Sequence, residues 1–203
     1  PNYPNWMELY NFSFTNGNSQ FTSYWSNNYT GISFANQVIE KVAEIPDGAI
    51  DPSVRSQIVK EARFLRAYYH LKLILNWKEI IVRDHYITDP DDLNRGLSSR
   101  TDTWDFIMQD LTDATSLPAG YGSDNLGRAT CGAAYAYLGF ANLTRAYEEP
   151  ARKDEFLKAA VTALDKVTGY SLEKNYASMF DASNKNCKES VFELQTSMST
   201  ANG

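Results

Sequence analysis

Apolar residues recur at helical spacing in five consecutive stretches, at about 25–44, 51–77, 101–116, 129–147 and 152–168. In the second stretch, Asp51 is suited to cap a helix and Pro52 to occupy its first turn. An apolar stripe follows at spacings of three and four residues, made of Ile58, Ala62, Leu65, Tyr69, Leu73 and Trp77. Such periodicity predicts amphipathic helices, each burying one face against a neighbour. The sequence therefore predicts a mainly all-α fold.

The fourth stretch is rich in small residues, namely Gly132, Ala133, Ala134, Ala136, Gly139 and Ala141. Small side chains allow a neighbouring helix to approach closely. Tyr135-x2-Leu138-Gly139 fits the first half of the tetratricopeptide pattern, although Asn142 replaces its usual tyrosine. We therefore expect tetratricopeptide-like helix pairs joined by long irregular loops.

Composition and charge exclude several classes of function. The 203 residues carry a formal net charge of -6 and have a pI near 5.0. A nucleic-acid partner is not expected, because phosphate binding favours a basic surface. No apolar run approaches the roughly 20 residues of a membrane-spanning helix. The chain has two cysteines, Cys131 and Cys187, which is too few for a disulfide framework.

The sequence shows no catalytic or metal-binding motif. The two histidines, His70 and His85, are fifteen residues apart and belong to no HExxH motif. We expect His70 to be a structural residue beside the stripe of the second helix. A GxSxG motif is absent, and the acidic residues show no spacing specific to a glycosidase. We expect no enzymatic activity, no cofactor and no metal.

The N-terminal segment is rich in aromatic and amide side chains. Residues 1–34 hold ten aromatic residues and seven asparagines with little periodicity, which predicts loops and a short helix near Pro4–Tyr10. Aromatic rings can cover the flat apolar faces of sugars, and amides can hydrogen-bond to their hydroxyl groups. The candidate ligand-binding residues are Trp6, Asn16, Asn18, Phe21, Tyr24 and Asn28. The alternative is that the aromatic residues pack this segment against the helices.

These predictions give one domain with three regions. Residues 1–24 form a loop-rich ligand face, residues 25–168 a helical repeat scaffold, and residues 169–203 an irregular segment that is extended near 189–195. Because the sequence starts at Pro1 and stops after a strand-like run, we expect the 203 residues to be part of a longer chain.

The order of motifs along the chain resembles that of the SusD/RagB family of Bacteroidetes outer-membrane nutrient-binding lipoproteins. The motifs that carry the resemblance are Trp25-x3-Tyr29-x2-Ile32-x3-Asn36-Gln37, Glu61-Ala62-Arg63-Phe64-Leu65-Arg66-Ala67-Tyr68-Tyr69, Arg100-x3-Trp104-x-Phe106-Ile107-x2-Asp110-Leu111, Gly127-Arg128-Ala129-Thr130, Gly169-Tyr170-x-Leu172 and Glu189-Ser190-Val191-Phe192-Glu193-Leu194-Gln195. The segment Trp77-Lys78-Glu79-Ile80-Ile81-Val82 departs from the family's usual aromatic-Gly-x-Val-Pro-like turn.

The resemblance implies a SusD-like α-α superhelix and a role in nutrient uptake. It also implies a lipid anchor at the cell surface, outside this segment, and a partner TonB-dependent, SusC-like channel. The cargo implied is an oligosaccharide, sometimes a peptide, and the sequence leaves the sugar open. For Arg63, Arg66 and Arg128, which belong to the family's motifs, we expect structural ion pairs.

The main alternative is a helical-repeat protein that binds a protein partner or a peptide. A glycosidase is a more distant alternative, which a search for turnover by the intact protein would test.

Overall fold

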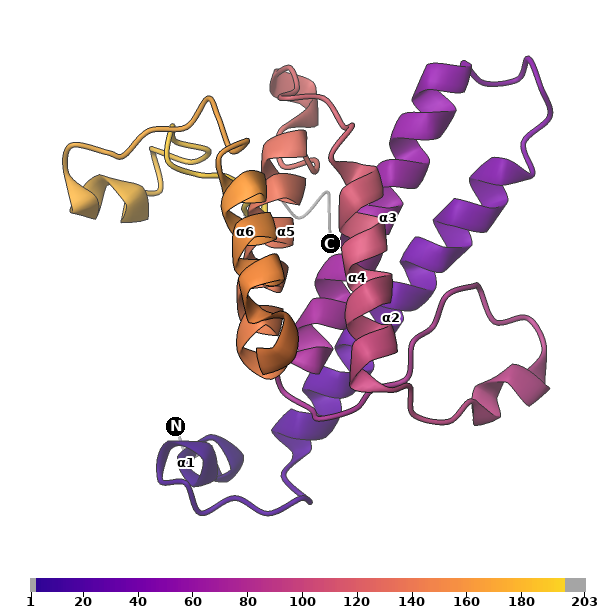
Figure 1. Ribbon diagram of the computed structural model, residues 1–203, viewed down its shortest axis with the longest axis vertical. Coiled ribbons are helices and arrows are strands. Elements are labelled where there is room, and N and C mark those ends of the chain that lie inside the picture. Colours follow the sequence, from indigo (N-terminus) through magenta and orange to yellow (C-terminus); the bar gives the residue numbers. More distant parts are fainter. Residues whose placement is uncertain (1–2, 196–203) are drawn as a thin grey trace.

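The computed structural model describes residues 3–195, which contain six α-helices and no β-strand (Figure 1). The only strand-like feature in this part of the chain is an isolated bridge between Ile80 and Ser98. The elements are α1 (Pro4–Tyr10), α2 (Ser19–Ala43), α3 (Pro52–Ile74), η1 (Pro90–Asn94), α4 (Arg100–Ala114), η2 (Ser123–Asn125), α5 (Cys131–Glu148), η3 (Pro150–Arg152), α6 (Lys153–Leu164) and η4 (Tyr176–Phe180). The predicted all-α fold is confirmed.

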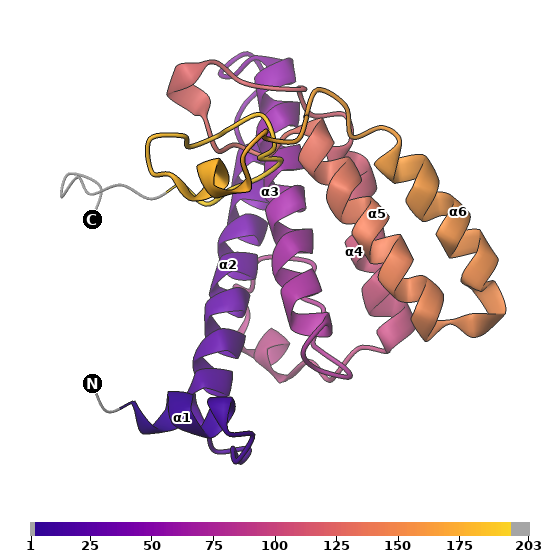
Figure 2. The same cartoon turned by 90° about the vertical axis from the view of Figure 1, so that its left-hand side faces the viewer.

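Each of the longer helices packs against the next one in the sequence. Contacts join α2 to α3, α3 to α4, α4 to α5 and α5 to α6, and Figure 2 shows these helices arranged in a row. Helix α1 lies at the starting end of α2, away from the rest of the row (Figures 1 and 2). The arrangement is that of helix pairs stacked side by side, as the sequence predicts.

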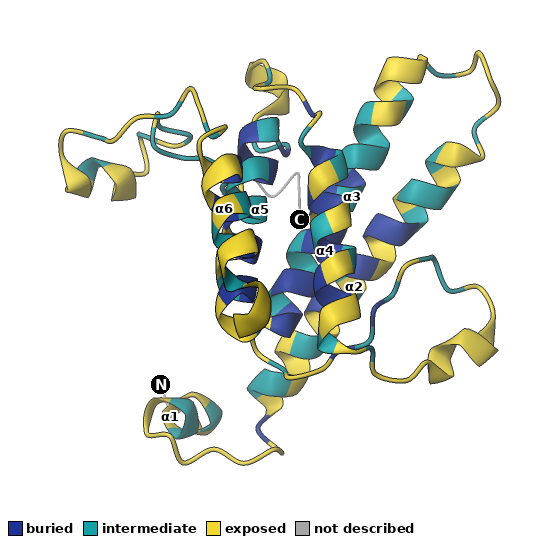
Figure 3. Cartoon of the chain, in the orientation of Figure 1, coloured by how far each residue is buried: buried dark blue, intermediate teal, exposed yellow. Residues whose placement is uncertain are grey.

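The core lies between α3, α4 and α5, where the helix faces are buried (Figure 3). Trp104, Ile107 and Leu111 follow one face of α4 and are fully buried, as their spacing predicts. On α3 the expected stripe is partly wrong, because Leu65 is 37% exposed. The buried positions of α3 begin with Ala62 and Phe64 and continue through Ala67, Leu71 and Ile74.

Helices α5 and α6 approach closely at Gly139. A Cβ atom at this position would lie 2.6 Å from Cγ of Leu164 and 3.4 Å from the carbonyl oxygen of Ala160. The hydrogen side chain of Gly139 therefore sets the separation of the two helices. This contact confirms the expected role of small residues in α5.

Several predicted boundaries differ from the structure. Helix α2 begins at Ser19, six residues before the expected Trp25, because the side chain of Asn18 caps it by accepting from the backbone N–H of Gln20. Helix α3 ends at Ile74 rather than at Trp77, and α6 ends at Leu164 rather than near residue 168. Residues 1–24 thus contain more helix than expected.

The expected extended segment at 189–195 forms no strand, and no neighbouring strand within residues 3–195 pairs with it. Its apolar residues are anchored instead, because Val191 and Phe192 pack against the helical core. The ring of Phe192 lies 5.0 Å from that of Phe64 and 6.4 Å from that of Tyr137, in edge-on geometry. The part of the expected 169–203 segment beyond residue 195 lies outside the described residues.

Candidate functional site

A groove with a volume of about 630 Å³ lies where α1 meets the first turns of α2. Helix α1 and the loop after it form one part of the lining. Helix α2 contributes residues between Gln20 and Asn27, and the segment just after α3 contributes the remaining two. The lining residues are Trp6, Leu9, Asn16, Gln20, Phe21, Ser23, Tyr24, Asn27, Asn76 and Trp77. Four of the ten are aromatic and four carry a side-chain amide.

The start of α2 explains why its lining residues share one side of the helix. The Asn18 cap starts α2 at Ser19, so the residues that follow are helical. Gln20, Tyr24 and Asn27 are separated by four and three residues in this helix. Residues at this spacing lie on one helical face. Phe21 and Ser23 flank that face, and the ring of Phe21 is held edge-on by Phe14 at 5.1 Å.

Aromatic rings form the apolar part of the groove. The ring of Trp77 lies 5.9 Å from Tyr24 and 5.0 Å from Trp25, so it is fixed between two side chains of α2. Trp6 is 58% exposed and Tyr24 is 36% exposed, so both rings retain surface that a ligand can cover. Such surfaces suit the apolar face of a ring-shaped ligand.

The polar part of the groove includes four amides. Among the described residues, only that of Asn76 is bound within the protein, to the carbonyl oxygen of Lys72. Among residues 3–195, the side chains of Asn16, Gln20 and Asn27 make no hydrogen bond to another protein group. Each amide offers both donors and an acceptor. The groove therefore presents hydrogen-bonding groups that can pair with hydroxyl groups in either direction.

The described lining contains no carboxylate, histidine, lysine or arginine. The nearest cation that the contacts show is Lys72, whose Nζ lies 5.3 Å from the ring centre of Tyr24 and 5.2 Å from that of Tyr68. Lys72 thus packs against aromatic faces beside the groove. A lining of rings and amides without charge favours a neutral, hydroxyl-rich ligand over an ionic one.

The structure brings four of the six predicted site residues together in this groove, namely Trp6, Asn16, Phe21 and Tyr24. Asn18 and Asn28 do not line it. Each has only 3% of its surface exposed. The Nδ2 group of Asn28 donates to the carbonyl oxygen of Tyr24 at 2.7 Å, whereas its Oδ1 has no partner among the described residues.

Sequence reasoning did not select Gln20, Ser23, Asn76 or Trp77 as site residues. Gln20 could have been found by extending the helical spacing of Tyr24 back by four residues, towards the Asn18 cap. Trp77 was assigned to the apolar stripe of the second helix, although α3 ends three residues earlier. No local sequence signal places Asn76 and Trp77 beside α2, because that contact depends on how the two helices pack.

A second hollow of about 240 Å³ lies beneath residues 81–93 and is lined mainly by apolar side chains. Four of its polar side chains, those of Tyr29, Asn36, Arg83 and His85, already have protein partners. Tyr29 donates to the carbonyl oxygen of Ile81 and accepts from the N–H of the same residue, and burial raises the pKa of Tyr29 to about 12. Asn36 donates to the carbonyl oxygens of Arg83 and His85. This hollow therefore offers a sugar few free polar groups.

The three motif arginines for which structural ion pairs are expected, Arg63, Arg66 and Arg128, all form them. Arg63 pairs with Asp113, Arg66 with Asp110, and Arg128 with Glu61. The expected structural roles of these side chains are confirmed.

His70 is fully buried and structural, as predicted. Its Nε2 accepts from the backbone N–H of Arg83 at 3.2 Å, so its Nδ1 carries the proton and donates to the carbonyl oxygen of Arg66 at 2.9 Å. Within residues 3–195, no three His, Cys, Asp or Glu side chains are placed to hold a metal ion. None of the helices in that range has the length and hydrophobicity of a membrane span.

Comparison with known proteins identifies the family to which the chain is similar. The family model SusD-like, described as starch-binding and associating with the outer membrane, matches residues 2–143. A SusD-like protein of Bacteroides ovatus is 26% identical over an alignment of 205 residues, which covers 96% of this chain and 36% of the relative.

Solved structures of SusD-like proteins also resemble this chain. A SusD-like protein of Bacteroides fragilis superposes with a TM-score of 0.75 at 29% identity, covering 90% of this chain and 35% of its own. A laminarin-binding SusD-like protein superposes with a TM-score of 0.73 at 28% identity, covering 84% and 36%. The chain thus spans little more than a third of the length of these three relatives.

Proposed function

This chain belongs to the SusD-like family, and on that premise we propose that it binds oligosaccharides at the cell surface through the groove between α1 and α2. The observation that carries the proposal is the lining of the groove, whose described residues include four aromatic rings, three amides without a protein partner and no charged side chain. Rings of this kind cover the flat faces of pyranose sugars, and the amides pair with the hydroxyl groups at their edges.

The uncharged lining favours neutral glycans. An ionised sugar would have to enter the groove without an opposite charge there, and it would lose part of its hydration without compensation. Binding of a neutral sugar makes no ion pair, so its affinity is expected to stay constant between about 0.05 and 0.5 M salt.

Calorimetry with the full-length protein tests this function. Starch oligosaccharides and laminarin serve as neutral ligands, a polyuronate as the acidic ligand, and a tryptic peptide mixture as the non-glycan ligand. We expect heat of binding from at least one neutral glycan, unchanged by salt. Binding of peptides alone, or of the polyuronate with a steep salt dependence, would overturn the proposal. Chromatography of the recovered glycan checks for turnover, of which none is expected.

The family resemblance further supports a place in nutrient import. In this proposal the protein is held at the outer membrane by a lipid anchor outside this segment and delivers its glycan to a TonB-dependent, SusC-like channel. Extraction of outer membranes in mild detergent, followed by affinity purification, is expected to recover the channel with the protein. Recovery of the protein without any channel, from membranes in which both are present, would contradict this partnership.

A further inference from the structure

Helix α1 has few contacts that hold it in place. It is seven residues long, none of its residues is buried, and no side chain caps its first turn. Isolated helices of this length are marginal in water, so α1 depends on its attachments to the rest of the protein. Its main neighbour is α2, and Figure 2 shows it lying at the end of that helix, away from the helical row. Those few attachments therefore determine where α1 lies.

Asn18 is the central attachment. Its Nδ2 group donates one hydrogen bond to the carbonyl oxygen of Asn5 and another to Oε2 of Glu8, both at 2.9 Å. Its Oδ1 accepts from the N–H of Gln20 at 3.0 Å and caps α2. One buried side chain thus joins α1 to the start of α2. A further bond runs from Nδ2 of Asn5 to Oγ of Ser19 at 2.6 Å.

The two elements that Asn18 joins contribute different parts of the groove. Helix α1 provides Trp6 and Leu9, whereas α2 provides Phe21 and Tyr24. The distance between these two groups of side chains depends on the position of α1 relative to α2. Because Asn18 is buried and both of its amide protons are already donated, it has no free donor for a ligand.

We propose that Asn18 is a positioning residue of the glycan groove, holding α1 through Glu8 and the Asn5 carbonyl so that Trp6 can cover a sugar bound beside Tyr24. This inference rests on the proposed function, because it assigns a role within the same groove. It differs from the sequence expectation, in which Asn18 contacts the ligand itself. It also differs from a role in helix capping alone, since Ser, Asp and Asn cap a helix about equally well.

The decisive variants keep the cap and remove the attachment. Asn18→Ser retains an oxygen for the N–H of Gln20 but loses both amide donors. We expect it to bind the neutral glycan about tenfold more weakly, because two hydrogen bonds that order the groove are lost. Asn18→Asp is expected to weaken binding further, because its carboxylate faces that of Glu8. The melting temperature of Asn18→Ser is expected to stay close to that of the wild type, because the cap is kept and α1 contributes no buried residue.

A double variant is expected to restore part of the binding lost in Asn18→Asp, through a hydrogen bond in the reverse direction. In the double variant Asn18→Asp/Glu8→Gln, the amide of the glutamine can donate to the new carboxylate, so the bond to residue 8 returns in the reverse direction, whereas the bond to the Asn5 carbonyl oxygen stays lost. We expect this variant to bind more tightly than Asn18→Asp alone. Asn175, which caps η4 by accepting from the N–H of Ala177, provides the matched control. Asn175→Ser and Asn175→Asp are expected to leave glycan affinity unchanged.

Hydrogen exchange of the α1 amides tests the positioning role without any glycan. We expect faster exchange in α1, but not in the middle of α2, for Asn18→Ser. Unchanged α1 exchange with wild-type affinity, or equal losses for the Asn18 and Asn175 variants, would overturn the inference. If the wild type binds no glycan, the proposed function fails, while the exchange measurement still decides whether Asn18 positions α1.

Discussion

Arg66 of α3 and Asp110 of α4 form a bidentate ion pair in the interior of the helical row. Nε of Arg66 lies 2.7 Å from Oδ2 of Asp110, and Nη2 lies 2.8 Å from Oδ1. The remaining nitrogen, Nη1, donates to Oδ1 of Asn36 on α2 and to the carbonyl oxygen of Asp84. A single guanidinium group therefore connects three helices and the loop that follows α3.

Removal of one partner of this pair is expected to destabilise the fold strongly. Arg66→Met leaves the carboxylate of Asp110 buried without its cation, and we expect a loss of about 3–5 kcal/mol in the free energy of unfolding. Denaturation in urea measures the loss. Lys41→Met provides the control, because the Lys41–Glu44 pair is exposed and its removal is expected to leave stability unchanged. A loss below about 1 kcal/mol for Arg66→Met would contradict the assigned role.

The buried state of His70 predicts a pH dependence of stability. Burial lowers the pKa of His70 to about 4, from an ordinary value of 6.5. Between these two values the unfolded chain binds a proton that the folded chain does not, so the free energy of unfolding falls as the pH decreases from about 6.5 towards 4. Urea denaturation at several pH values is expected to show a shallower fall for His70→Gln than for the wild type. Parallel curves would contradict the prediction.

His85 is expected to change the free energy of unfolding with pH in the opposite direction to His70. It therefore serves as a control for the sign of the pH dependence. Hydrogen bonds to Asp92 and Asp84 raise the pKa of His85. Its stabilising contribution is therefore present below about 6.5 and is lost as the pH rises through the raised pKa. His85→Gln is therefore expected to reduce the free energy of unfolding below about pH 6.5 and to have no effect above the raised pKa.

The contact between α5 and α6 gives a third prediction. A side chain at Gly139 would overlap Leu164, so Gly139→Val is expected to lower the free energy of unfolding by about 1–3 kcal/mol. Leu143→Val adds the same β-branched residue at a position of α5 that is 40% exposed, and it is expected to cost only a few tenths of a kcal/mol. Thermal denaturation measures both changes.

A double variant tests whether the overlap causes the loss. Leu164→Ala makes room beside residue 139, so Gly139→Val/Leu164→Ala is expected to lose less stability than the sum of its single variants. Additive losses would show that the separation of the helices is not what Gly139 determines.

Local patterns predict the helices well where they span several turns. The spacing of Trp104, Ile107 and Leu111 identifies the buried face of α4, because each of these residues contacts the core directly. On α3 the same reasoning fails at Arg66. A charged residue is expected on the exposed face, and its burial depends on Asp110, a partner 44 residues further along the chain that no local spacing identifies.

The groove, too, is predictable from the sequence only in part. The aromatic and amide content of residues 1–24 indicates Trp6, Phe21 and Tyr24 as candidates, because their rings are chemically suited to a sugar. All three line the groove in the structure. The sequence does not distinguish a lining amide from a buried one, so Asn16 and Asn18 are equivalent on composition. Only the fold shows that the amide of Asn18 is donated within the protein.

The aromatic rings of the groove give the last prediction. Trp6 and Tyr24 are exposed, line the same groove and have ring faces that a sugar can cover. Tryptophan and tyrosine side chains at the centre of a binding site contribute the most affinity, so Trp6→Ala is expected to weaken neutral-glycan binding by about 2 kcal/mol, or about 30-fold. Tyr24→Ala is expected to have a smaller effect, since its ring also packs against Trp77 and Lys72.

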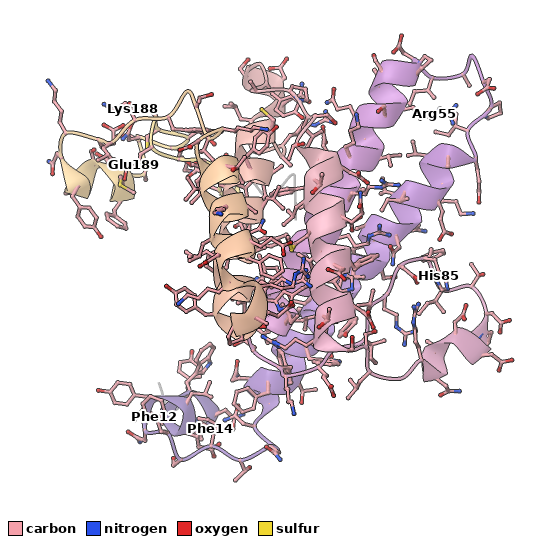
Figure 4. The ribbon with its side chains drawn as sticks, viewed as in Figure 1. Phe12, Phe14, Arg55, His85, Lys188 and Glu189 are labelled. Atoms are coloured by element: carbon pink, nitrogen blue, oxygen red, sulfur yellow. The ribbon has the colours of Figure 1, made fainter. Side chains whose placement is uncertain are left out.

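Phe12 provides the matched control for these variants. It lies just after α1, is 86% exposed and does not line the groove (Figure 4). Phe12→Ala removes an exposed aromatic ring of the same segment, so it is expected to leave glycan affinity unchanged in calorimetry. Equal losses for Phe12→Ala and Trp6→Ala would mean that binding depends on the general apolar character of the segment. In that case the groove between α1 and α2 would not be the glycan site.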